Sequence, residues 1–142
     1  MDEWAHGHDK KTVLAQIGRG EYTPRYMQWK RMLVPSEYRK VVEQSKIIVA
    51  HAGMGSFFFA MEMQKPIVML PRYAARNEHT TDHQVHTLKW LRHKPNVYAA
   101  MTEEELPKAI ENALANAGND TSEFHRFAPE QFVQKIRQFL VQ

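Results

Sequence analysis

The stretch IIVAHAGMGSFFFAMEMQKPIVMLPR, residues 47–72, is the most informative part of the sequence about the fold. An apolar run ends at His51, two glycines and a serine follow, and a segment rich in Phe and Met leads to a second apolar run. Short apolar runs bounded by glycine or proline predict buried strands. The Phe, Ala and Met content of the segment between them predicts a helix. The stretch therefore predicts a βαβ unit, whose two strands run parallel.

The same alternation extends along the rest of the chain. Apolar runs predict four strands, and the segments between them predict helices, with Ser36 and the Thr102–Glu105 pair as N-terminal caps. The strands are expected at 12–18, 46–53, 66–72 and 96–101, and the helices at 36–45, 56–64, 80–93, 103–117 and 129–142. This order predicts an α/β fold, a Rossmann-like parallel sheet with flanking helices. Residues 1–118 are expected to form the α/β domain.

Residues 119–142 are expected to form a linker and a C-terminal amphipathic helix. Phe132, Ile136 and Phe139 lie on one stripe of that helix. We expect the stripe to pack on the domain or on a partner.

Composition sets the broad class of the protein. The chain has 142 residues, 43% of them hydrophobic and 25% charged, and a net charge of +3. This balance is typical of one globular domain rather than a disordered chain. There is no cysteine, which excludes disulfides and thiolate metal sites. The apolar runs are far shorter than the roughly 20 residues of a spanning helix, so a cytoplasmic protein is expected.

The turn after the second strand has the features of an anion site. Gly53 and Gly55 let a ligand approach the backbone, Ser56 adds a hydroxyl at the helix start, and His51 could donate to a phosphate oxygen. The alternative is that the glycines only permit a tight turn and His51 is an ordinary loop histidine. A dinucleotide fingerprint does not fit, because Phe58 stands where a third small residue is needed, and the chain has no P-loop sequence.

The next strand ends in the polar loop PRYAARNEHTTDHQ, residues 71–84. Carboxylate, amide and imidazole groups of this kind can bind the hydroxyls of a sugar. They are Arg72, Arg76, Glu78, His79, Asp82, His83 and Gln84. Because both loops leave the carboxyl edge of a parallel sheet, we expect them to form one site for a sugar nucleotide, with the diphosphate at the first loop and the sugar at the second.

Three motifs in order, AHAGMGS, KPIVMLPR and EHTTDHQ, give the chain a family resemblance. It resembles the C-terminal, donor-binding domain of glycosyltransferase family 28, one half of a GT-B fold. It is most similar to the stand-alone donor-binding subunits of two-component glycosyltransferases of bacterial exopolysaccharide and dolichol-linked glycan synthesis. The resemblance implies a glycosyltransferase that takes a sugar from a nucleoside diphosphate, with UDP expected, to a lipid-linked acceptor.

The resemblance also implies where the other components lie. A membrane-anchored partner subunit would supply the acceptor site and the general base, so no catalytic residue is assigned in this chain. The protein would sit at the cytoplasmic face of the membrane through that partner. No cofactor, metal or nucleic acid is expected.

Carried over residue by residue, the resemblance assigns two groups of ligands. His51, Gly53, Gly55 and Ser56 would hold the diphosphate, and Asp82 and Gln84, with His83 beside them, would hold the sugar. The family commonly has a ribose-binding Glu where this chain has Phe59. Glu62 and Glu78 are the candidates to replace it, with Arg72 and His79 in supporting roles.

The start of the chain departs from the family pattern. Related subunits open with a strand and a Gly-Thr turn, whereas this chain opens at DEWA. The first strand of the sheet is therefore expected to be missing, and its neighbours are expected to have unpaired edges.

Two other classes of function stay open at this stage. His79, His83 and His86 have a spacing close to that of metal ligands on one helical face, with Asp82 among them. The connector RYMQWKR, residues 25–31, interleaves aromatic and basic residues, which could bind nucleic acid or a membrane surface. Either feature would make the chain a non-catalytic binding module.

Overall fold

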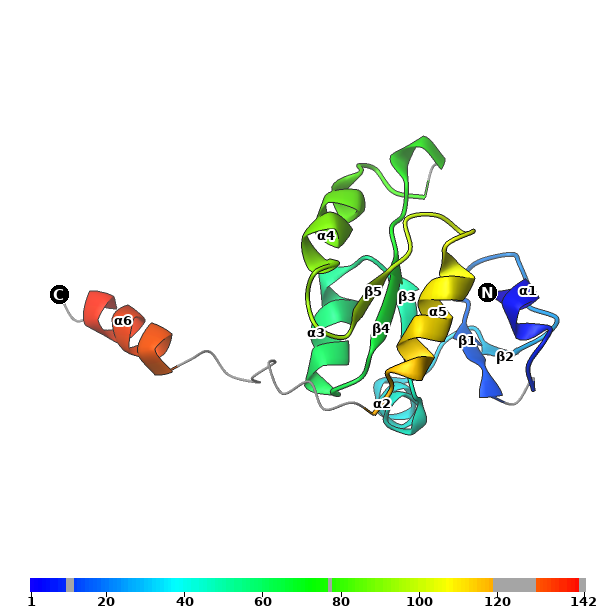
Figure 1. Ribbon diagram of the computed structural model, residues 1–142, viewed down its shortest axis with the longest axis horizontal. Helices are drawn as coiled ribbons and strands as arrows, with labels where there is room; N and C mark the ends of the chain where they lie inside the picture. Colours follow the sequence, from blue (N-terminus) through cyan, green and yellow to red (C-terminus); the bar gives the residue numbers. More distant parts are fainter. Residues whose placement is uncertain (10–11, 77, 119–129, 141–142) are drawn as a thin grey trace.

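The computed structural model describes residues 1–9, 12–76, 78–118 and 130–140. Helices and strands alternate along most of this length (Figure 1). In chain order they are α1 (Asp2–Ala5), β1 (Leu14–Gln16), β2 (Gln28–Lys30), α2 (Pro35–Gln44), β3 (Ile48–His51), α3 (Met54–Glu62), β4 (Ile67–Leu70), the 3-10 helix η2 (Ala74–Arg76), α4 (His83–Leu91), β5 (Val97–Ala99), α5 (Leu106–Ala115) and α6 (Glu130–Leu140).

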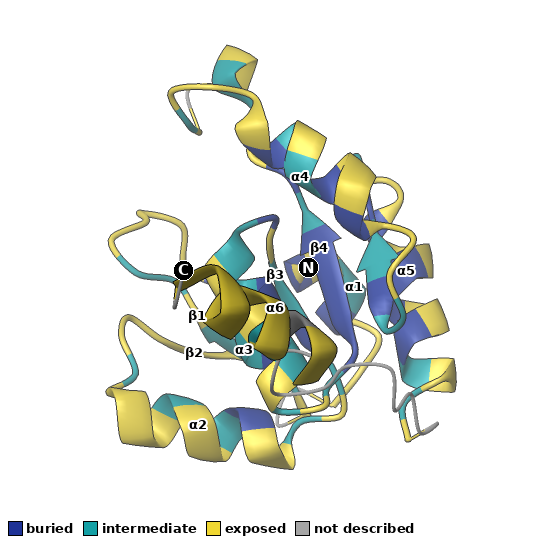
Figure 2. Cartoon of the chain, turned by 90° about the vertical axis from the view of Figure 1, so that its left-hand side faces the viewer, coloured by how far each residue is buried: buried dark blue, intermediate teal, exposed yellow. Residues whose placement is uncertain are grey.

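Three parallel strands form the centre of the fold in the order β3–β4–β5. The middle strand, β4, is the most buried, because Ile67, Val68 and Met69 have no exposed surface. Figure 2 shows it as a continuous buried strand. A parallel strand buried in this way needs helices on both faces of its sheet. The structure thus confirms the predicted α/β, Rossmann-like fold.

Alternate side chains of β4 enter two separate apolar clusters. Ile67 and Met69 pack with residues of α2, α3 and α4, whereas Val68 packs with residues of α5. Successive side chains of a strand point to opposite faces of the sheet. The helices therefore cover both faces, and the carboxyl ends of β3 and β4 stay accessible from one edge.

A second, smaller sheet consists of β1 and β2, which also run parallel. It lies on the β3 side of the larger sheet in both views (Figures 1 and 2). In the part of the chain that is described, no ladder joins β1 to β3. The sheet predicted as one is thus divided into two, and the outer edges of β1 and β3 carry no strand partner there, as the sequence led us to expect.

Three local features differ from the sequence-based expectations. The helix expected at Ser36 begins at Pro35 with Val34 as its N-cap, since proline suits the first helical position. The helix expected to be capped by Thr102 begins at Leu106, and the Glu105 carboxylate instead accepts the Met101 N–H at 2.7 Å. Strand β2 was not predicted, because its three residues are all exposed and show no apolar alternation.

Helix α6 confirms the helix expected near the C-terminus, and Figure 1 shows it apart from the α/β body. Ile136, Phe139 and Leu140 are 44%, 79% and 75% exposed. The linker expected from residue 119, and the side chain of Phe132, lie outside the described residues. No described helix combines the length and the apolar character needed to cross a membrane.

Candidate functional site

The turn after β3 brings a helix N-terminus to the carboxyl edge of the sheet. Gly53 is the N-cap of α3, and no side chain caps this helix. The Phe57 N–H is the first to donate within the helix, to the Gly53 carbonyl at 3.2 Å. The N–H groups of Met54, Gly55 and Ser56 therefore have no acceptor inside the helix. Together with the helix dipole they form a donor set suited to an anion.

The space around this helix start is open at one position. A Cβ atom built at Gly55 would meet no atom within 4 Å. A ligand could thus lie directly against the first turn of α3 at this point, which is the role that the sequence predicted for Gly55.

His51 is the last residue of β3 and lies near the Arg72 guanidinium. Burial, and then the nearby charges of Arg72 and His79, lower the pKa of His51 below its ordinary value of 6.5. The imidazole is therefore neutral at neutral pH and can both donate and accept a hydrogen bond. An anion bound here would favour its protonated form.

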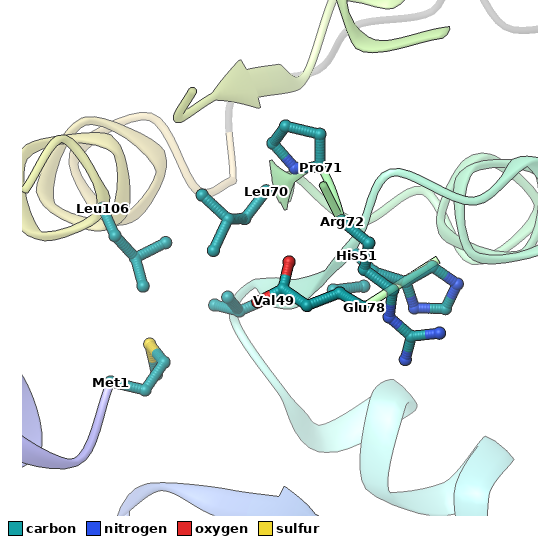
Figure 3. Close-up of a pocket in the computed structure, with 9 residues that line it drawn as sticks. Met1, Val49, His51, Leu70, Pro71, Arg72, Glu78 and Leu106 are labelled. Carbon is teal, nitrogen blue, oxygen red and sulfur yellow. The ribbon is translucent and has the colours of Figure 1, made fainter. Parts of the chain in front are cut away.

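A pocket of about 350 Å³ opens at the same edge of the sheet (Figure 3). Its apolar side comes from β3, β4 and the start of α5, and its polar side comes from the end of β3 and the loop after β4. The lining residues are Met1, Val49, Ala50, His51, Leu70, Pro71, Arg72, Glu78 and Leu106. A mostly apolar cavity with a few polar groups on one wall is typical of a ligand site.

Of the residues predicted from the sequence, His51, Arg72 and Glu78 line this pocket. Gly53, Gly55 and Ser56 follow His51 along the chain, at the start of α3, and are not among the lining residues. The turn predicted to bind an anion and the pocket thus lie next to each other, and His51 belongs to both.

The side chains expected to bind the sugar make hydrogen bonds to the backbone of their own loop. Gln84, which is only 3% exposed, accepts the Arg72 N–H at 3.0 Å. Asp82 accepts the Ala74 N–H through Oδ1 at 2.8 Å. These two bonds fold the loop back on the start of α4, and they set the path of the chain past Arg72.

The other candidates lie around this loop or on neighbouring helices. The rings of His79 and His83 meet edge to face with centroids 4.3 Å apart, and His83 Nδ1 is 2.8 Å from the Thr81 hydroxyl. Among the described residues, which include His86, no group of three or more His, Asp or Glu side chains is arranged to hold a metal.

Glu62 and Phe59 occupy the side of α3 that faces α2. Glu62 forms an ion pair with Arg39 at 3.0 Å, and the Phe59 ring lies 5.0 Å from that of Tyr38. Neither residue lines the pocket. Of the two acidic candidates for ribose recognition, Glu78 is the one in the pocket.

Sequence reasoning missed the apolar wall of the pocket and the contact between Tyr73 and Glu78. Val49, Leu70 and Leu106 were read only as strand and helix residues, and nothing local distinguishes them from core residues. Tyr73 donates its N–H to Glu78 at 3.0 Å. Its position between Arg72 and the rest of the polar loop was the only available signal.

Comparison with known proteins gives one result. The model of the family described as "Glycosyltransferase family 28 C-terminal domain" matches residues 2–138. No curated protein and no solved structure matches the chain. The match covers the turn after β3, the polar loop and every residue that lines the pocket except Met1.

Proposed function

This chain belongs to glycosyltransferase family 28, and from that premise we propose that it is the donor-binding subunit of a GT-B enzyme that transfers a sugar from UDP to a lipid-linked acceptor. The observation that supports this most is the pairing of an uncapped helix N-terminus at Gly53 with a pocket lined by His51, Arg72 and Glu78. Both lie at the carboxyl edge of a parallel sheet, where such folds bind their ligands.

The diphosphate would bind at the start of α3. Its oxygens would accept from the N–H groups of Gly55 and Ser56 and from the imidazole of His51, with the Arg72 guanidinium adding positive charge. These groups can donate without prior reorganisation, because the helix itself leaves its first N–H groups without acceptors.

During transfer the acceptor hydroxyl oxygen forms a bond to the anomeric carbon of the sugar. The bond from that carbon to the diphosphate oxygen breaks, and negative charge develops on the departing diphosphate. Donors fixed at the start of α3 stabilise this charge. The hydroxyl proton passes to a base, which the proposal assigns to the partner subunit.

The sugar would lie against the loop after β4. Asp82 Oδ1 already accepts the Ala74 N–H, and Oδ2 would accept a hydrogen bond from a sugar hydroxyl. Gln84 is buried and its Oε1 accepts the Arg72 N–H, so its NH₂ group is the donor left for the ligand. His83 adjoins both residues at the start of α4.

The acceptor would be bound by a second, membrane-anchored subunit. A GT-B cleft lies between two domains, and each is usually comparable in size to the 142 residues here. The exposed apolar residues of α6 are the proposed contact with that subunit. Docking would bring this chain to the cytoplasmic face of the membrane.

A thermal-shift panel of nucleotide sugars, nucleoside diphosphates and inorganic pyrophosphate tests the donor site. UDP sugars are expected to raise the melting temperature. Gly55→Val places a side chain in the open space at the start of α3 and should abolish the shift, while circular dichroism stays unchanged. If the folded Gly55→Val protein binds nucleoside diphosphates as tightly as the wild type, the diphosphate does not bind at the start of α3.

Asp82→Asn tests the sugar assignment separately. The amide can still accept the Ala74 N–H, so the loop should keep its path. Loss of a charge-assisted bond to a sugar hydroxyl should weaken binding of the nucleotide sugar by about tenfold and leave binding of the bare nucleotide unchanged. Equal losses for both ligands would assign Asp82 to the loop alone.

A further inference from the structure

Glu78 is held in the pocket by a pair of hydrogen bonds to one residue, Tyr73. The Tyr73 N–H donates to Glu78 Oε2 at 3.0 Å, and the Glu78 N–H donates back to the Tyr73 carbonyl at 3.3 Å. The two bonds close a ring between Tyr73 and Glu78. The Glu78 carboxylate is thereby directed into the pocket (Figure 3).

Tyr73 is in turn anchored to the segment that follows β5. Its hydroxyl donates to the Met101 carbonyl at 2.6 Å. The Arg76 guanidinium lies 5.4 Å from the centroid of the Tyr73 ring and forms an ion pair with Glu103. Tyr73 is thus fixed through its ring and its hydroxyl, while its backbone N–H fixes Glu78.

This arrangement leaves one oxygen of Glu78 for a ligand. Oε2 is engaged by Tyr73, whereas Oε1 can accept hydrogen bonds from hydroxyl groups. Glu62, the other acidic candidate, is paired with Arg39 outside the pocket. A carboxylate held in a defined orientation discriminates between hydroxyl arrangements better than a mobile one, because less side-chain freedom is lost on binding.

We propose that Glu78 is a specificity-determining residue that binds hydroxyl groups of the nucleotide sugar, and that Tyr73 is a positioning residue that holds its carboxylate in place. The inference rests on the proposed function and deepens it. Through the bond from Tyr73 to the Met101 carbonyl, the segment after β5 would contribute to donor recognition, although it supplies no carboxylate to the pocket.

The test measures two affinities in parallel, one for the UDP sugar that gives the largest thermal shift and one for inorganic pyrophosphate. Glu78→Gln should weaken binding of the UDP sugar by about tenfold, because a charged acceptor is lost, and should leave pyrophosphate binding within about twofold. Tyr73→Phe removes only the bond to Met101 and should weaken UDP-sugar binding by about threefold to tenfold.

A double-mutant cycle distinguishes positioning from general damage to the fold. In the Glu78→Gln background, Tyr73→Phe should cause no further loss of affinity, because the carboxylate that it positions is absent. Tyr98→Phe, on β5 and outside the pocket, is the matched control and should change neither affinity. Circular dichroism and melting temperature check that each variant folds.

The outcomes separate the two proposals. If the wild-type chain binds neither UDP sugars nor pyrophosphate, the proposed function fails and this inference fails with it. If it binds both and Glu78→Gln leaves the UDP-sugar affinity unchanged, only the inference is overturned. If the losses of UDP-sugar affinity from Tyr73→Phe and Glu78→Gln add in the double variant, Tyr73 has only a structural role. The same holds if Tyr73→Phe weakens pyrophosphate binding as much as UDP-sugar binding.

Discussion

The imidazole of His51 occupies the space that a side chain at position 53 would need. A Cβ built on Gly53 would lie 2.6 Å from Nε2 and 3.0 Å from Cδ2 of His51, too close for either atom to stay in place. The backbone at Gly53 has φ −97°, which any residue can adopt. Glycine therefore keeps the His51 ring in this position by leaving space for it, and not through its conformational freedom. It lets the histidine fold over the turn that begins α3.

Gly53→Ala should displace the His51 ring while leaving the backbone of the turn intact. We expect nucleoside diphosphate binding to weaken by about tenfold, the range for one charge-assisted hydrogen bond. The His51 pKa should rise toward its ordinary value, because a displaced ring is more hydrated. Titration calorimetry and histidine NMR chemical shifts measure the two effects.

The double variant His51→Ala with Gly53→Ala is the control. If Gly53 acts through His51, the second substitution adds no loss to the first. Independent losses would show that Gly53 contacts the ligand itself.

The lowered pKa of His51 predicts a pH dependence of stability. Burial, with Arg72 and His79 nearby, disfavours the protonated ring in the folded state. Below about pH 6.5 the unfolded chain takes up a proton that the folded chain resists, so stability should fall as the pH drops from that value toward the folded-state pKa. His51→Gln should remove this part of the slope in urea unfolding between about pH 5.5 and about pH 7.5.

The difference in slope between wild type and His51→Gln is the quantity to compare. His86→Gln, on the exposed side of α4, should leave the slope close to that of the wild type. Identical slopes in wild type and His51→Gln would contradict the prediction.

Asp2 ties α1 to the connector before β2. The residue is 9% exposed, and its carboxylate accepts the Arg25 N–H at 2.9 Å, the Tyr26 N–H at 2.9 Å and the Tyr22 hydroxyl at 2.5 Å. Burial alone would raise the pKa of Asp2, but these hydrogen bonds outweigh it and lower the pKa. The stabilisation is therefore present above about pH 4 and lost as the pH falls through the folded-state pKa.

Asp2→Asn should lower the melting temperature at neutral pH, because the amide NH₂ would face backbone donors. The difference from wild type should shrink as the pH falls from about 4, where the unfolded chain begins to protonate Asp2, through the lower pKa of the folded state. Glu3→Gln, the neighbouring exposed acid, is the matched control. A melting difference that does not change with pH would rule out the carboxylate as its cause.

The exposed apolar residues of α6 should carry the contact with a partner subunit. Ile136→Asp with Phe139→Asp should leave the melting temperature of the isolated chain unchanged, because both side chains are already exposed. Co-expressed with the neighbouring gene's product, the wild-type chain should enter the membrane fraction, and the double variant should return to the soluble fraction.

Gln134→Asp with Gln138→Asp adds the same charge to the opposite side of α6 and serves as the control. This variant should still co-purify with the partner. Sugar transfer to a lipid acceptor by the isolated chain would contradict the need for a second subunit.

The βαβ order and the turn between β3 and α3 could be predicted from the sequence alone. Strand β4 was predictable because its apolar run is continuous, and the turn because glycines, Ser56 and His51 follow one another within a few residues. The family motifs lie in the same local segments. These features depend on neighbours in sequence, so the order of the residues is enough to reveal them.

Which polar groups face the pocket depends on the tertiary structure. In the sequence, Glu62 and Glu78 were equal candidates for ribose recognition. In the structure, Glu62 forms an ion pair with Arg39 of α2, whereas Glu78 lines the pocket. Gln84 and Asp82 hold the loop backbone, and Tyr73 reaches the Met101 carbonyl. Strand β2 exists only through its pairing with β1. Each of these outcomes depends on a hydrogen-bond partner that folding brings close, and a side chain's own sequence neighbourhood does not specify that partner.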